Sequence, residues 1–140
     1  MRFVLDTNVV VAGLRSPTGA SAELLDRALQ GAFTLVLSVA LALEYEAACN
    51  APVQRMASGL EESEVATIIS ALCAVAEPVG TRFLWRPQLR DPADEMVLEA
   101  AINGGADALV TFNRRDFGDA PDRFGIALLS PRQALRRIPT

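Results

Sequence analysis

The chain has 140 residues, of which 51% are hydrophobic, and its mean hydropathy is positive, so it can bury a substantial core. It has no histidine, and all 13 of its basic residues are arginines. These absences exclude Ser-His triads, histidine metal sites, Schiff-base lysines and the lysine of phosphate-binding P-loops. The formal net charge of -4 argues weakly against a nucleic-acid binder, although the arginines could still be grouped locally.

The length suits one compact domain, and we expect residues 1–140 to form it. No apolar run approaches the roughly 18 residues that a membrane helix needs. Asp6 interrupts the N-terminal apolar stretch too early for a signal peptide, so a cytoplasmic location is expected. Cys49 and Cys73 lie in apolar helical patterns, where buried thiols are expected rather than a disulfide.

The first half of the chain alternates short apolar runs with helical patterns. Residues 2–6 are predicted to form a buried strand. A stripe of leucine and alanine predicts a helix over 20–32, and the apolar run 33–37 predicts a second strand. Ser38 is a suitable N-cap for a helix over 38–50.

The second half continues this alternation. Acidic residues in a first turn predict a helix over 61–76, and a weaker strand is expected within 77–84. The other predicted elements, in order, are a helix over 91–105, a strand over 107–111, a loop over 113–125, a strand over 126–130 and a helix over 131–138. Short apolar strands between helices are typical of a parallel sheet covered on both faces, so the predicted fold class is α/β, a three-layer α/β/α sandwich with a central parallel sheet.

Polar residues follow two of the predicted strands. Asp6 ends the first strand, and Thr111 and Asn113 stand at and after the end of the strand over 107–111. Ligands bind at the carboxyl ends of strands in such folds, so these side chains can converge if the first strand is central. The alternative for Asp6 is an N-cap for a helix that starts at Val9.

Glu44 interrupts an apolar helical face that includes Leu41 and Ala48. An unpaired buried carboxylate is costly, so a partner such as a cation is expected there. The alternative is a glutamate at the edge of the apolar stripe with its carboxylate in water. Its neighbour Glu46 falls on a face typical of solvent exposure.

Asp94 also heads an apolar face, which continues through Val97, whereas Glu95 and Glu99 fall on the opposite face and are expected to be solvated. The alternative is that Asp94 is only the favoured acid in the first turn of a helix capped by Asp91.

Asp116 follows the strand over 107–111 more distantly. It competes with Asp119 and Asp122, because loops are rich in aspartate for turn reasons.

Taken together, acidic residues from several elements face one end of a sheet. Such a cluster raises its own pKa values unless a divalent cation is present. Oxygen-only ligation indicates Mg²⁺ or Mn²⁺, and these ions with carboxylates and a water are typical of phosphodiester hydrolysis.

Four stretches of the sequence resemble a PIN domain. They are "FVLDTNVVVAGL", "EYEAA", "DPADEMVLEAAINGGADALVTFNRRDF" and "ALLSPRQAL". The chain is most similar to VapC-like toxin components of bacterial toxin–antitoxin pairs, in the same order over nearly its whole length. The resemblance implies a Mg²⁺- or Mn²⁺-dependent ribonuclease that acts on RNA, is held inactive by a cognate antitoxin protein and forms a homodimer.

The resemblance also implies the roles of site residues. Asp6, Glu44 and Asp94 are the implied acidic metal-site residues, with Asn8 and Thr111 as polar supports and Asn8 orienting Asp6. Many relatives have an aspartate where this chain has Asn113, and others have asparagine there and an acid three residues later. The fourth acidic role therefore goes to Asp116, with Asn113 beside it.

The predicted function is a metal-dependent endoribonuclease that hydrolyses RNA phosphodiester bonds, the toxin of a toxin–antitoxin pair. Arg114 and Arg115 are candidates for phosphate contact, or simply solvated loop charge. A phosphatase with Asp6 as nucleophile, similar to the haloacid-dehalogenase class, is disfavoured because Asn8 replaces a required aspartate and lysine is absent. The other alternative is a catalytically degenerate PIN domain that binds nucleic acid or protein, which the Asn113 departure keeps open.

Overall fold

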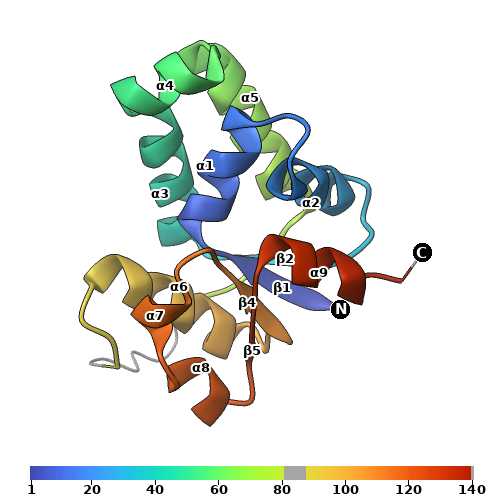
Figure 1. Ribbon diagram of the computed structural model, residues 1–140, viewed down its shortest axis with the longest axis vertical. Helices are drawn as coiled ribbons and strands as arrows, with labels where there is room; N and C mark the ends of the chain where they lie inside the picture. The colour runs from blue at the N-terminus through green and yellow to red at the C-terminus, as the bar shows by residue number, and fades with distance from the viewer. Residues whose placement is uncertain (81–87, 140) are drawn as a thin grey trace.

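The computed structural model describes residues 1–80 and 88–139, and a parallel sheet of five strands lies at its centre (Figure 1). The strands are β1 (Arg2–Leu5), β2 (Thr34–Leu37), β3 (Glu77–Pro78), β4 (Ala108–Val110) and β5 (Ala127–Leu129). Their order in the sheet is β3-β2-β1-β4-β5, with β1 paired to β2 on one side and to β4 on the other. Strand order therefore reverses at β1, which places a ligand crevice at its carboxyl end.

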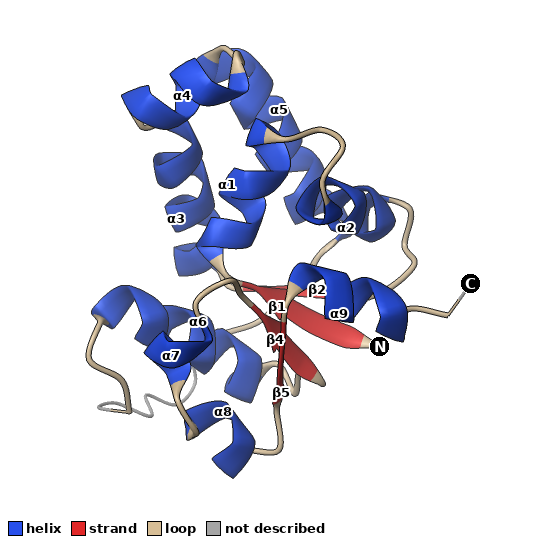
Figure 2. Cartoon of the chain, viewed as in Figure 1, coloured by secondary structure: helices blue, strands red, loops and turns tan. Residues whose placement is uncertain are grey.

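Helices cover both sides of this sheet (Figure 2). On one side lie α1 (Thr7–Arg15), α2 (Ala20–Leu29), α3 (Val39–Asn50), α4 (Pro52–Ser58) and α5 (Glu62–Val75). On the other lie α6 (Pro92–Asn103), α7 (Arg114–Phe117) and α8 (Ala120–Arg123), while α9 (Pro131–Arg137) packs against α2 and β5. The predicted α/β/α sandwich is confirmed.

The core consists of the apolar strands and the helix faces that cover them. Phe3, Val4 and Leu5 of the central strand have no exposed surface, because helices lie on both faces of the sheet. Gly104 ends α6 where a Cβ atom would come within 2.3 Å of the Val36 side chain. Only glycine therefore lets this end of α6 approach β2 closely.

The predicted strands and longer helices are confirmed to within a few residues. Ser38 caps α3 by accepting a hydrogen bond from the amide of Leu41. The weak strand expected within 77–84 is β3 at its start, and positions 81–84 lie outside the described residues.

Three parts of the prediction differ from the structure. The expected loop over 113–125 contains two one-turn helices, α7 and α8, which bury Phe117, Ala120 and Pro121. Helices α1 and α4 were not predicted, apart from the helix starting at Val9 considered as an alternative for Asp6. Each of these elements is short, and packing rather than sequence pattern stabilises it.

The two cysteines are free, as expected, but only Cys49 is buried. The prediction of a buried Cys73 was wrong, because the buried stripe of α5 runs through Val65, Ile69 and Leu72 and leaves Cys73 exposed beside it. Within residues 1–80 and 88–139, every helix is too short or too polar to span a lipid bilayer.

Candidate active site

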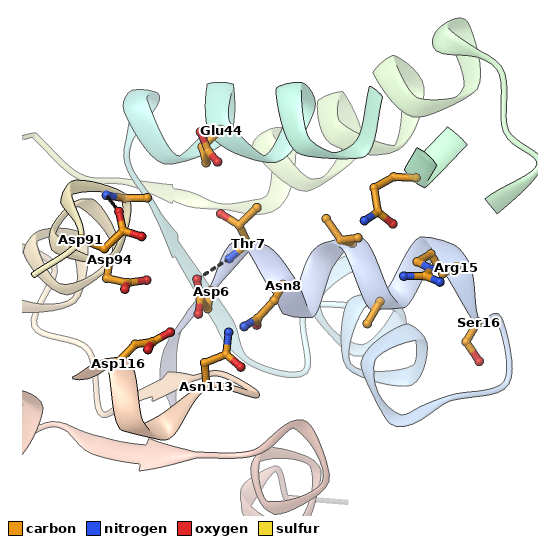
Figure 3. A pocket seen from close by; sticks show the side chains of 14 residues that line it. Asp6, Thr7, Asn8, Arg15, Ser16, Glu44, Asp91, Asp94, Asn113 and Asp116 are labelled. Carbon is orange, nitrogen blue, oxygen red and sulfur yellow. Dashed lines mark hydrogen bonds between the residues drawn. The ribbon is translucent and has the colours of Figure 1, made fainter. Parts of the chain in front are cut away.

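A cavity of about 760 Å³ opens at the carboxyl end of the central strand (Figure 3). Its lining includes five acidic side chains, those of Asp6, Glu44, Asp91, Asp94 and Asp116. They come from the end of β1, from α3, from the start of α6 and from α7, so the fold brings together acids that are far apart in the sequence. All four acids predicted for the site line this one cavity.

Asp6 has two structural functions at once. Its amide donates a hydrogen bond of 2.8 Å to the carbonyl of Val110, which continues the pairing of β1 with β4. Its Oδ1 accepts a hydrogen bond of 2.8 Å from the amide of Thr7 and so caps α1. Only 6% of the residue is exposed. The N-cap considered as an alternative is therefore present, and it holds the Asp6 carboxylate at the cavity wall.

Thr111 holds the other oxygen of this carboxylate. Its hydroxyl donates a hydrogen bond of 2.7 Å to Oδ2 of Asp6 and accepts one of 2.9 Å from the amide of Asn113. The side-chain amide of Asn8 donates to the same hydroxyl at 3.5 Å. One donor and two acceptor positions complete the capacity of a hydroxyl group. Asn8 was predicted to orient Asp6 by hydrogen bonds, and its side-chain amide bonds to Thr111, the residue that holds the Asp6 carboxylate.

Tyr45 links the helix that carries Glu44 to the strand that ends at Asp6. It is fully buried on α3, and its hydroxyl donates a hydrogen bond to the carbonyl of Leu5. Burial, with the nearby Asp6 charge, raises the pKa of Tyr45 well above its usual value, so the group stays a neutral donor. Tyr45 was not predicted as a site residue, although its spacing from Leu41 and Cys49 marks a buried helical face.

Asp94 lies in the first turn of α6, beside the N-cap Asp91, whose side chain accepts a hydrogen bond of 2.9 Å from the amide of Ala93. Burial raises the pKa of Asp94 to about 6, and the charges of Asp6, Asp91 and Asp116 add to the increase. The first-turn location considered as an alternative is therefore correct. It does not exclude Asp94 from the site, because the side chain faces the other carboxylates (Figure 3).

The pKa of Asp6 is also raised. Burial is the main cause, and the charges of Asp116 and Asp91 add to it, whereas the hydrogen bonds from Thr111 and Thr7 oppose it. These acids therefore repel one another across the cavity, which is the electrostatic setting that a bound cation relieves.

The match to a family model decides the classification of this chain. A model of the PIN domain matches residues 2–115, most of the chain. The chain belongs to the PIN domain family. PIN domains are generally nucleases and typically use divalent metal ions, so this PIN domain has a nuclease-type function that acts on nucleic acid. No curated protein sequence matches it.

The residue predicted as the fourth acid, Asp116, lies just beyond the matched residues. Asp116 is exposed on α7 and lines the cavity, together with Asn113. Asp119 lines a second hollow beside this cavity but not the cavity itself, and Asp122 lines neither the cavity nor the hollow. Of the three candidates in this segment, Asp116 is the one beside Asp6 and Asp94.

The donor set of this PIN domain fits a hard divalent cation. The acidic side chains offer only oxygen ligands, which Mg²⁺ and Mn²⁺ prefer. Among the described residues, no three acidic or thiol side chains already stand close enough to hold one ion together. Mg²⁺ keeps several of its waters and is often bound through one or two carboxylates, so this spacing fits a hydrated cation.

The prediction of a solvated face on α6 was wrong for two glutamates. Glu95 and Glu99 were expected on a solvated face, but they are 3% and 1% exposed. Oε1 of Glu95 accepts hydrogen bonds of 2.7 Å from the amides of Gln88 and Leu89, so the preceding chain folds over this face. Glu46 is exposed, as predicted.

One of the two arginines considered for phosphate contact, Arg114, bonds to other elements of the fold. Arg114 donates to the carbonyl of Leu128 at 3.0 Å and to Oε1 of Gln133 at 2.6 Å, so it holds α7 against α9. Arg15 and Gln54 line the cavity, and no sequence pattern indicated them, because they belong to α1 and α4.

Proposed function

We propose that this PIN domain is a Mg²⁺- or Mn²⁺-dependent endoribonuclease and the toxin of a toxin–antitoxin pair. The observation that carries the proposal is the Asp6 carboxylate. It is buried, held by Thr111 and Thr7, and faces Asp94 and Asp116 in a cavity at the carboxyl end of the central strand. A carboxylate cluster placed in this way is suited to hold a hard cation beside a phosphodiester.

Asp6, Glu44, Asp94 and Asp116 would hold the cation in this proposal, one or two of them directly and the others through its bound waters. When bound, such an ion neutralises the carboxylates, draws charge from a phosphate oxygen and lowers the pKa of a water molecule. Thr111 keeps the Asp6 carboxylate in one orientation, and Tyr45 fixes the backbone just before it. These contacts preorganise the centre for in-line attack of water on the phosphodiester.

The proposed partners are a cognate antitoxin protein and a second copy of the chain. Support for an antitoxin comes from apolar side chains at the surface of the helices that border the cavity. On α3 and α4, Val39, Leu43, Val53 and Met56 are 62–85% exposed, whereas Glu44 and Gln54 of the same helices line the cavity. An antitoxin segment seated on these side chains would lie beside the carboxylates.

Cleavage of a labelled single-stranded RNA tests the proposal. The purified chain should cut internal bonds with Mg²⁺ or Mn²⁺ and not with a chelator. Asp6→Asn should lower the rate by at least about 100-fold, while Asp26→Asn, at an exposed position on α2, should leave it unchanged. RNA binding without metal-dependent cleavage would instead support the catalytically degenerate binding module.

A further inference from the structure

A second hollow, of about 680 Å³, adjoins the acidic cavity. The two spaces share Asp91, Asp94 and Asp116 in their linings. The second one lies between residues 88–91, the start of α6 and the α7–α8 segment, and three arginines line it: Arg90, Arg115 and Arg123. We call this space the arginine hollow.

The guanidinium groups of the arginine hollow are not paired with the acids around them. Among residues 1–80 and 88–139, none of the three arginines forms an ion pair, although four aspartates line the same space. Arg123 donates a hydrogen bond of 3.3 Å to the neutral side chain of Gln88. By contrast, Arg114 donates from its Nη2 atom to Leu128 and Gln133. Of the two consecutive arginines on α7, Arg115 is the one that lines the hollow.

A polyanionic substrate needs unpaired cationic groups of this kind close to the cavity. The chain has a formal net charge of -4, and its cavity is lined by five acids against one arginine, Arg15, so RNA is repelled from the metal-free centre itself. Arginine binds a phosphate group through two parallel N–H donors, a geometry that lysine cannot provide. All basic residues of this chain are arginines. The three unpaired guanidinium groups lie in the hollow that directly continues the acidic cavity. The phosphate next to the reacting one would lie there.

We propose that the arginine hollow binds the backbone phosphates of single-stranded RNA beside the scissile bond, an inference that rests on the proposed nuclease function. Asp6 is only 6% exposed, so the scissile phosphodiester must enter the cavity to reach it. A flexible single strand can bend into a concave site, whereas a duplex holds its phosphates on a stiff convex surface. Arg115 and Arg123 hold the strand on the α7–α8 side, and Arg90 holds it near the start of α6.

RNA binding measured as a function of salt tests the proposal. Fluorescence anisotropy with a short labelled single-stranded RNA, in chelator so that no cleavage occurs, compares the parent with the Arg115→Gln/Arg123→Gln variant. The matched control is Arg132→Gln/Arg136→Gln, which removes the same charge from exposed positions on α9. We expect the first variant to bind about tenfold more weakly. The plot of log affinity against log salt concentration should become shallower, its slope decreasing in magnitude by about 0.7 for each phosphate that the variant no longer neutralises. The control should keep the parental slope.

Each outcome decides one of the two ideas. Equal affinity and slope in the two double variants would overturn the arginine hollow while leaving the nuclease function intact, provided the parent cleaves RNA with metal. Equal binding of a duplex and a single strand by the parent would overturn the single-strand assignment. If the parent binds RNA with the expected dependence on the arginines but never cleaves it, the proposed nuclease function is contradicted. RNA binding by the arginine hollow is then still supported. In the cleavage assay the Arg115→Gln/Arg123→Gln variant should raise KM more than it lowers kcat.

Discussion

The Thr111 hydroxyl and the Asp6 carboxylate are 105 positions apart in the sequence and are joined by a hydrogen bond of 2.7 Å. Each residue directly follows a strand, β4 and β1 respectively, and these two strands are neighbours in the sheet. The orientation of the proposed catalytic carboxylate is therefore set by the pairing of two parallel strands rather than by a loop.

Thr111→Val should separate this hydrogen bond from the packing of the side chain. The substitution keeps the shape but leaves Oδ2 of Asp6 and the amide of Asn113 without their partner. We expect metal affinity or cleavage to fall by about 10- to 100-fold and unfolding to become easier by about 1–3 kcal/mol. Mn²⁺ titration and urea denaturation measure the two effects. Thr67→Val is the matched control, because the Thr67 hydroxyl is exposed and, among the described residues, bonds to the carbonyl of Ser63 in the same helix. An equal loss in this control would show that the hydrogen bond of Thr111 to Asp6 has no special role.

Asp94 should make the metal-free protein less stable as the pH rises. Its pKa is raised from 3.8 to about 6 in the folded state, so between these values the folded chain binds more protons than the unfolded chain. The free energy of unfolding therefore falls as the pH increases through this range, and the full penalty is present above it. Because Asp94 is partly exposed, solvent screening reduces the effect, and we expect about 1 kcal/mol.

Urea denaturation in chelating buffer at about pH 5 and about pH 7 measures this difference. Asp94→Asn removes the titrating group and should flatten the dependence, with the variant more stable than the parent at the higher pH. An unchanged pH dependence in the variant would show that the carboxylate is not under electrostatic strain.

Much of the fold could be predicted because its strands are buried on both faces. The runs ending at Leu5, Leu37 and Val110 are continuous and apolar, and short runs of this kind between helical patterns are typical of strands in a covered parallel sheet. Asp6 and Thr111 were found for the same reason, since a polar residue at the carboxyl end of such a strand is conspicuous.

Other features depend on contacts that no local pattern records. Glu95 and Glu99 are spaced like solvated residues, yet both are buried, and the amides of Gln88 and Leu89, from outside the helix, donate to Glu95. Helix periodicity describes which residues share a face, not whether a second segment packs on it. Arg15 and Gln54 border the cavity only because α1 and α4 pack beside α3.

Asp116 should contribute to metal binding, whereas Asp119 should not. Both belong to the same segment, but only Asp116 lines the cavity that contains Asp6. A ligand that binds only the folded state raises the midpoint of thermal unfolding, so Mn²⁺ should stabilise the parent and the Asp119→Asn variant to the same extent. Asp116→Asn should weaken this stabilisation by roughly the equivalent of a tenfold loss of affinity. Equal responses of the two variants would remove Asp116 from the metal site.

The exposed apolar side chains of α3 and α4 should be needed for inhibition by an antitoxin and not for cleavage. Leu43 is 62% exposed and Met56 is 85% exposed, on the two helices whose other faces contribute Glu44 and Gln54 to the cavity. Leu43→Ser/Met56→Ser should weaken binding of the proposed antitoxin by about tenfold or more, because apolar anchors dominate such interfaces. Leu29→Ser is the control, since Leu29 is a partly exposed leucine on α2, away from the cavity lining. Titration of the antitoxin into the RNA cleavage assay gives the inhibition constant. If the double variant is inhibited as tightly as the control, the antitoxin does not bind the α3–α4 surface.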